Sequence, residues 1–191
     1  GLVSVDSRRN IMGYLLSSLG NLPVDDEIKF YVFVINGQWQ EPLYRMIEEN
    51  FSLIASSIGK HAVIAKGLYP VEWRDDIAKK YLGKDYNDLF ALLPALLITD
   101  THPKQVTENS LRLVVPLRDV ESRFGGWGQF FDLLSDFVQL KNDEFIRRFQ
   151  KKEDVFDAVS KIITVSPGAF GVSINVNELL SRWRKRFNGN L

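Results

Sequence analysis

The run KFYVFVI, residues 29–35, constrains the fold of this chain more than any other stretch. Its residues are almost all β-branched or aromatic, and Asn36-Gly37 follows as a stop signal, so the run predicts a β-strand. Apolar and polar residues do not alternate along it, which indicates a strand that is buried on both faces. Such a strand is typical of the centre of an α/β sheet, with helices covering each face.

The segments after this strand continue an alternating pattern. Residues 43–58 carry apolar side chains at helical spacing, behind Pro42 in the first turn and ahead of Gly59 as a C-cap. Residues 61–65, HAVIA, predict a second short strand, and residues 71–82 predict a second helix. Because a helix joins the two strands, we expect them to pair in parallel.

Two more strands are predicted further along the chain, at residues 95–99 and 111–115, with a polar loop between them. A short loop predicts that these two strands pair in antiparallel fashion. Residues 127–140 then show helical spacing, and the run FGGWGQFF at 124–131 is interpreted as a bend where this helix begins. The predicted fold class is therefore α/β, a mixed sheet of about four strands with helices on both faces.

The two ends of the chain are expected to flank this domain, which covers residues 29–141. Residues 1–28 predict a helical extension, with an amphipathic helix from residue 6 to residue 19. Residues 142–191 predict a C-terminal appendage of a charged helix, a β-hairpin and a basic helix. The alternating strand at residues 170–176 belongs to this hairpin, and an exposed edge there is a candidate for homodimer formation.

The order of these elements, together with one proline, resembles the thioredoxin fold. The resemblance is carried by FYVFVI, the helix after it, HAVIA and LLPALLITD, which together span residues 29–140. In that family a proline with a cis peptide bond precedes the third core strand, and Pro94 stands at this position. A trans proline at the start of a strand is the alternative that needs no family.

The chain departs from that family where the redox chemistry is expected. The family's Cys-x-x-Cys pair would follow residue 35, but the sequence there is NGQWQEPL and the chain contains no cysteine. The resemblance therefore implies a redox-inactive domain whose groove beside the proline binds an extended peptide of a protein partner by β-augmentation. The expected partner-binding residues are Asn36, Gln38, Trp39, Gln40 and Pro94, with Trp39 either anchoring the partner or packing onto the following helix.

Composition excludes several classes of function. With no cysteine and only two histidines among 191 residues, thiol catalysis, thiolate metal sites and multi-histidine metal sites are excluded, and we expect no metal and no cofactor. The 24 basic and 24 acidic residues balance, so a bulk attraction to nucleic acid is not indicated. No apolar run approaches the ~18 residues that a membrane span needs, and the lack of cysteine fits a cytoplasmic location.

Two alternatives to protein binding stay open. The first is a cysteine-independent enzyme whose site combines the 36–40 loop, Pro94 and the pair Asp100 and His102, since an Asp-x-His pair can supply an acid and a base. The second is attachment to nucleic acid or an anionic membrane through a basic patch in the last helix. This basic patch consists of Arg182, Arg184, Lys185 and Arg186.

Overall fold

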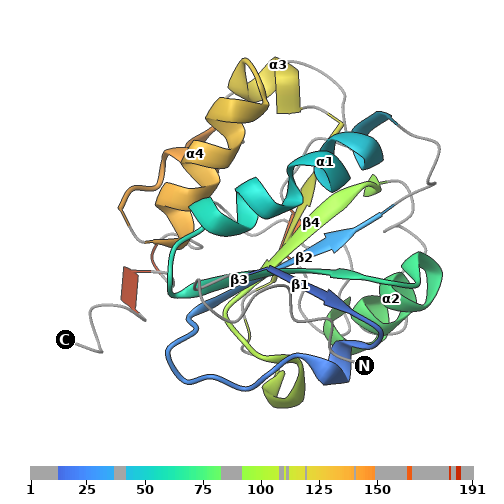
Figure 1. Ribbon diagram of the computed structural model, residues 1–191. Coiled ribbons are helices and arrows are strands. Elements are labelled where there is room, and N and C mark those ends of the chain that lie inside the picture. The colour runs from blue at the N-terminus through green and yellow to red at the C-terminus, as the bar shows by residue number, and fades with distance from the viewer. Residues whose placement is uncertain are drawn as a thin grey trace.

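A six-stranded mixed sheet forms the centre of the computed structural model, with the strand order β1-β3-β2-β4-β5-β6 (Figure 1). The structure describes residues 13–36, 42–82, 92–107, 110, 112–118, 120–139, 141–148, 163–164, 181 and 184–185. β1, β3 and β2 pair in parallel, whereas β2–β4, β4–β5 and β5–β6 are antiparallel pairs. The strands are β1 Gly13–Leu16, β2 Phe30–Ile35, β3 Ala62–Gly67, β4 Ala95–Thr99, β5 Arg112–Pro116 and β6 Ile163–Thr164.

β2 lies inside the sheet and is buried along its whole length, as the unbroken apolar run predicts. Its side chains alternate between two cores because successive residues of a strand point to opposite faces. Phe30, Val32 and Val34 enter one core, and Phe33 and Ile35 enter the other. The predicted parallel pairing of the first two strands and antiparallel pairing of the last two are both confirmed.

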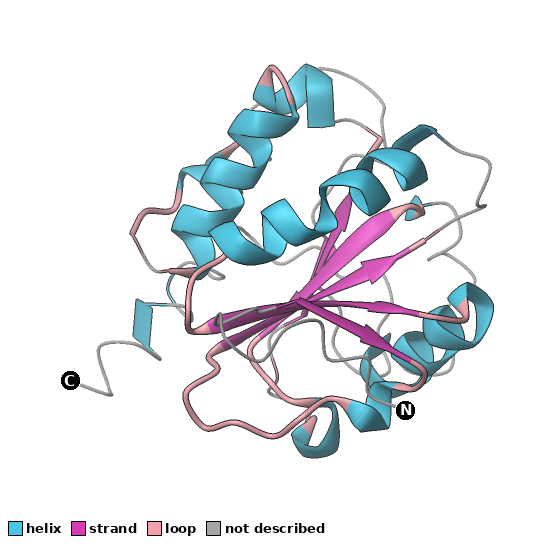
Figure 2. Cartoon of the chain, viewed as in Figure 1, coloured by secondary structure: helices cyan, strands magenta, loops and turns pink. Residues whose placement is uncertain are grey.

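Helices cover both faces of the sheet, which confirms this part of the prediction (Figure 2). In the view of Figure 1, α1, α3 and α4 lie above the sheet and α2 lies on the other side. The helices of the upper face are α1 Pro42–Ser57, α3 Val120–Phe124, α4 Trp127–Val138 and α5 Glu144–Arg147. The opposite face carries α2 Pro70–Ile77, its π-helical continuation η2 Ala78–Leu82, and the 3₁₀ turns η1 Leu19–Asn21 and η4 Pro103–Gln105.

The N-terminal segment corrects the predicted helix over residues 6–19. Residues 13–16 form strand β1, which pairs in parallel with β3, and residues 1–12 lie outside the described residues. The edge of β3 offers backbone partners that local helical periodicity does not reveal, and tertiary pairing outweighs weak helix propensity. Gly13 permits the close packing that results, because a Cβ on it would lie 2.7 Å from the Cβ of Ala55 in α1.

The C-terminal side also differs from the prediction. Phe145 and Ile146 of α5 are fully buried in the core beside α4, so the core extends beyond residue 141. β6 adds a further strand against β5, so that together with β1 the sheet has six strands instead of about four. Both added strands lie at sheet edges, where a sequence pattern of only a few residues gives little warning.

The glycine-rich run acts as the predicted bend. Gly125 and Gly126 have φ values of 74° and 147°, which favour glycine, and they separate α3 from α4. Trp127 opens α4 and packs near Phe130 and Phe131, with ring centroids 5.7 and 5.9 Å away. The half-buried tryptophan therefore packs against the apolar core on this face of the sheet.

Several predicted elements lie outside the described residues. They are the strand at 170–176 and most of the predicted basic helix near the C-terminus, of which residues 181, 184 and 185 are described and helical. Among the helices that are described, none combines the length and apolar character that a bilayer crossing requires.

Candidate functional site

Asn36 and Pro94, two of the predicted binding residues, lie next to each other at one edge of the sheet. Ile35 pairs with Ala95 in the antiparallel register, so the residues that follow and precede them are neighbours. The Leu93–Pro94 peptide bond is cis, as the family resemblance implies, and the Pro94 carbonyl accepts a hydrogen bond of 2.9 Å from the Leu117 N–H. Gln38, Trp39 and Gln40 lie outside the described residues.

Both residues are buried and therefore offer little surface to a partner. Asn36 is 5% exposed and Pro94 is buried as well, together with Leu92 and Leu93 before it. The side-chain oxygen Oδ1 of Asn36 has no hydrogen-bond partner within the described part of the chain.

The neighbouring strand β3 ends at the same edge, because parallel strands place their carboxyl ends together. Trp73 of α2 closes this end: its Nε1 donates to the Val34 carbonyl at 2.9 Å, and its ring packs edge-on against Phe33 at 5.9 Å. Gly67 leaves room for the indole, since a Cβ there would lie 2.3 Å from the Cβ of Trp73. The Leu68 N–H then donates to the Leu16 carbonyl at 2.8 Å and holds the strand end against β1.

Beyond this closed end, apolar side chains are exposed to solvent. Tyr69 is 57% exposed, Val71 55%, Leu68 42% and Leu15 on β1 37%. We refer to Leu15, Leu68, Tyr69 and Val71 as the apolar edge. Four of the six large apolar side chains that are exposed in the described residues belong to it. Leu68, Tyr69 and Val71 follow one another closely along the chain, and Leu15 lies on the adjoining strand. Exposed apolar residues that cluster mark interaction surfaces, whereas single ones are ordinary.

Asp100 and His102 do not join Asn36 and Pro94 in one site. They follow the far end of β4, and the five extended residues Ala95–Thr99 separate Pro94 from Asp100 by about 20 Å. His102 is 2% exposed and both of its ring nitrogens are engaged. Nδ1 accepts from the Lys104 N–H at 3.1 Å, and Nε2 lies 3.0 Å from the Leu22 carbonyl, to which it donates. The alternative of an enzyme site that combines these residues is therefore wrong in its geometry.

A second set of buried polar contacts holds the residues that follow β4. Tyr81 of η2 donates its hydroxyl to the Thr101 carbonyl at 2.8 Å, and burial, followed by the nearby Tyr31, raises the pKa of the Tyr81 phenol. Arg112 of β5 is 2% exposed and donates from Nη2 to the Thr107 carbonyl at 2.6 Å. Burial lowers the pKa of the Arg112 guanidinium. These contacts fix the segment after β4.

The basic patch is described only at Arg184 and Lys185, both exposed, whereas Arg182 and Arg186 lie outside the described residues. Arg184 does not offer an isolated charge, since its Nη2 lies 2.9 Å from Oδ2 of Asp143. The same carboxylate accepts from Arg147, and this hydrogen bond is the main reason why the pKa of Asp143 is lowered. One of the four predicted cations thus ties the C-terminal segment to α5.

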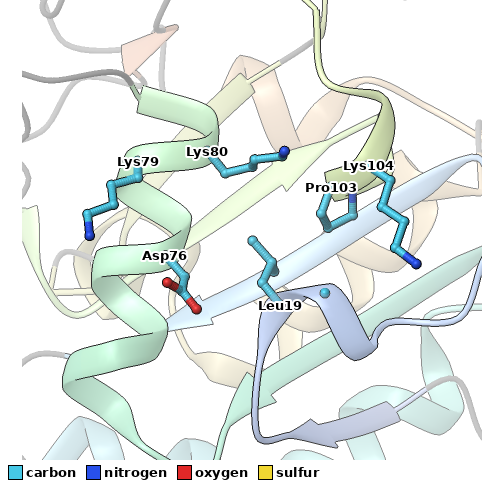
Figure 3. A pocket seen from close by; sticks show the side chains of 7 residues that line it. Leu19, Asp76, Lys79, Lys80, Pro103 and Lys104 are labelled. Atoms are coloured by element: carbon cyan, nitrogen blue, oxygen red, sulfur yellow. The ribbon is translucent and has the colours of Figure 1, made fainter.

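A cavity of about 310 Å³ opens between η1, the end of α2 with η2, and η4 (Figure 3). Sequence reasoning missed it, because the elements that form it are far apart along the chain. The only local signal was the adjacent pair Lys79 and Lys80, and two neighbouring lysines by themselves indicate an exposed helix face. The residues that line the cavity are Leu19, Gly20, Asp76, Lys79, Lys80, Pro103 and Lys104.

The arrangement contains no evident catalytic centre in its described part. No group of three or more His, Asp or Glu side chains there is placed to hold a metal ion. Comparisons with protein-family models, curated proteins and solved structures find no match for the chain. A function has to be inferred from the chain's own residues.

Proposed function

We propose that the chain is a non-catalytic protein-binding domain with a thioredoxin-like arrangement of its sheet. An apolar segment of a partner protein binds at the edge where β1, β3 and β2 end. The single observation that carries the proposal is the apolar edge, which exposes four large apolar side chains at this position. Ligands of open α/β sheets commonly bind at the carboxyl ends of the strands.

The thioredoxin-like part of the proposal is supported by the position of the cis proline. The resemblance implies a cis proline directly before the third core strand and beside the end of the first, and Leu93–Pro94 meets both conditions. The order of strands and helices from β2 to α4 is also the order on which the resemblance was based.

The non-catalytic part of the proposal follows from what stands in the place of the redox pair. Without cysteine the chain cannot exchange disulfides, and Asn36 occupies the end of β2 with a buried amide. His102 is engaged through both nitrogens, so it is not available as a general base. No observation on the described residues favours an enzyme over a binding domain.

The partner we propose offers an apolar extended segment. β1 is the outer strand of the sheet in the described part of the chain, and the apolar edge continues from it into the start of α2. An added strand would gain backbone hydrogen bonds from β1, while its apolar side chains would cover Leu68 and Tyr69. Trp39, three residues after Asn36 in the sequence, lies outside the described residues, and its contribution stays a prediction from the sequence.

The test compares two double variants of the full chain. Each variant is first used as bait in a lysate, where partners are cross-linked to it and identified by mass spectrometry. The affinity of each variant for the purified partner is then measured. Tyr69→Ser with Val71→Ser removes the two most exposed side chains of the apolar edge. Leu53→Ser with Val24→Ser is the matched control, because these side chains are 67% and 54% exposed elsewhere. Losing roughly 3 kcal/mol of apolar burial predicts an affinity about 100-fold lower for the edge variant only.

The proposal requires that a partner retained by the control variant is lost by the edge variant. Equal retention by both variants would place the partner elsewhere, and equal loss would indicate nonspecific apolar adhesion. Sedimentation equilibrium of the unmodified chain distinguishes a second copy from a different protein. A dimer that dissociates in the edge variant would replace the heterologous partner with the homodimer predicted from the sequence.

A further inference from the structure

The cavity between η1, η2 and η4 has an unbalanced charge. Three lysines and one aspartate line it, Lys79, Lys80 and Lys104 against Asp76, which leaves a local charge of +2. The whole chain has a formal charge of zero, so the excess is a property of this place. In Figure 3, Lys80 extends from η2 toward Pro103, and Lys104 stands beyond this proline on η4.

The three ammonium groups of the cavity have no partner among the residues that the structure describes. In the described part of the chain none of them forms an ion pair or a hydrogen bond, and the same is true of the Asp76 carboxylate. Other charged side chains of the described residues do pair, for example Lys66 with Glu48 at 2.5 Å and Arg148 with Glu144 at 2.9 Å. The cavity therefore concentrates cations whose hydrogen-bonding capacity is unused.

The walls of the cavity are fixed to one another by buried contacts. His102 joins η4 to the residue that follows η1, through its hydrogen bond to the Leu22 carbonyl. Tyr81 joins η2 to the chain before η4, through the Thr101 carbonyl. A preformed site loses less conformational entropy when a ligand binds. The π-helical geometry of η2, which carries two of the lysines, is itself frequent at functional sites.

We propose that this cavity binds a small phosphate ester whose organic part carries hydroxyl groups. Lysine ammonium groups are common phosphate ligands, and a phosphate monoester carries close to two negative charges at neutral pH, which matches the local charge of the cavity. The Asp76 carboxylate accepts hydrogen bonds from hydroxyl groups. Leu19 and Pro103 provide the apolar surface on which the carbon skeleton rests, and a volume of about 310 Å³ suits a small ligand.

The experiment measures binding to the full chain by isothermal titration calorimetry at low ionic strength. The probes are ribose 5-phosphate, ribose, inorganic phosphate and succinate, so that the phosphate, the hydroxyl groups and negative charge alone are separated. We expect ribose 5-phosphate to bind more tightly than the other three. Its affinity should fall steeply as salt is added, because exposed charges are screened.

Matched variants locate the site. Lys80→Gln with Lys104→Gln is expected to weaken ribose 5-phosphate by roughly tenfold for each lysine. Lys60→Gln with Lys141→Gln removes the same charge from exposed positions away from the cavity and should leave the affinity unchanged. Asp76→Ala should abolish the preference for the ester over inorganic phosphate, whereas Asp76→Asn, which keeps a hydroxyl acceptor, should preserve it.

Three results would overturn the proposal. They are no binding of ribose 5-phosphate at millimolar concentration, equal weakening by the two lysine pairs, and an affinity for inorganic phosphate or succinate that equals the affinity for the ester. Circular dichroism of each variant verifies that the fold is kept. The variant with both remote lysines replaced shows how much affinity is lost when charge is removed away from the cavity. No residue lines both the cavity and the apolar edge, and the two tests change different side chains, so failure here leaves the proposed protein-binding function to its own test.

Discussion

Replacing His102 by alanine is expected to destabilise the chain and thereby show that this histidine is structural. The side chain is 2% exposed and links three elements: it caps η4 at Lys104, it donates to the Leu22 carbonyl after η1, and it packs edge-on against Tyr31 at 5.6 Å. The Lys104 N–H can only donate and the Leu22 carbonyl can only accept. The neutral ring therefore carries its proton on Nε2.

The magnitude follows from these contacts. Each of the two hydrogen bonds contributes about 1 kcal/mol, and the edge-on aromatic contact adds about 1 kcal/mol. The expected loss in free energy of unfolding for His102→Ala is therefore about 3 kcal/mol, or a decrease in Tm of roughly 6–12 °C for a chain of this size. His102→Asn keeps an acceptor at the cap of η4 and should lose about half as much.

Urea denaturation followed by circular dichroism measures the change, and His61→Ala is the control. His61 is exposed and makes one hydrogen bond, from Nδ1 to the Glu27 carbonyl at 3.1 Å, so its replacement should cost less than about 1 kcal/mol. A cost for His102→Ala as small as that of His61→Ala would refute the reasoning. It would show that the η1–η4 contact does not hold the cavity walls together.

Two further predictions concern the strand end and the buried tyrosine. Gly67→Ala should lower the free energy of unfolding by more than about 2 kcal/mol in urea denaturation, because its Cβ would collide with Trp73. Gly128→Ala is the comparison: its Cβ meets nothing within 4 Å, so it should stabilise α4 by about 0.5–1 kcal/mol. Similar values for the two variants would contradict the packing described for Gly67. Burial raises the pKa of the Tyr81 phenol in the folded chain. As pH rises above about 10, the phenol of the unfolded chain therefore loses its proton first, and the free energy of unfolding falls by up to about 1.4 kcal/mol per pH unit. Tyr81→Phe should flatten this alkaline slope by about one proton in denaturation curves recorded between about pH 9 and 11, and an unchanged slope would mean that Tyr81 titrates normally.

The central sheet could be predicted because its strands and their partners carry strong local signals. β2 is apolar throughout, β4 was predicted with the bounds that the structure has, and the lengths of the connections fixed the parallel and antiparallel pairs. β1 and β6 could not be predicted in the same way. Each has four residues or fewer, and each becomes a strand because an existing strand offers a hydrogen-bonding edge.

The candidate sites also differ in whether local sequence signals or tertiary contacts determine them. Asn36 and Pro94 were placed together by the family resemblance, and the pairing of Ile35 with Ala95 makes them neighbours. The predicted enzyme site combined Asn36 and Pro94 with Asp100 and His102. These two pairs lie at opposite ends of β4, and an extended strand of this length separates them by about 20 Å. The sequence also contained no indication that His102 is buried.

The sequence by itself determined the α/β class, the central strands and the absence of thiol chemistry, because these depend on local apolar patterns and on which residue types are present. Only the tertiary structure decided which apolar residues remain exposed, so the apolar edge could not be recognised among many similar side chains. It also brought Lys80 and Lys104 to opposite sides of one cavity. Burial and charge proximity depend on contacts between segments distant in the chain, and no local pattern of residues encodes those contacts.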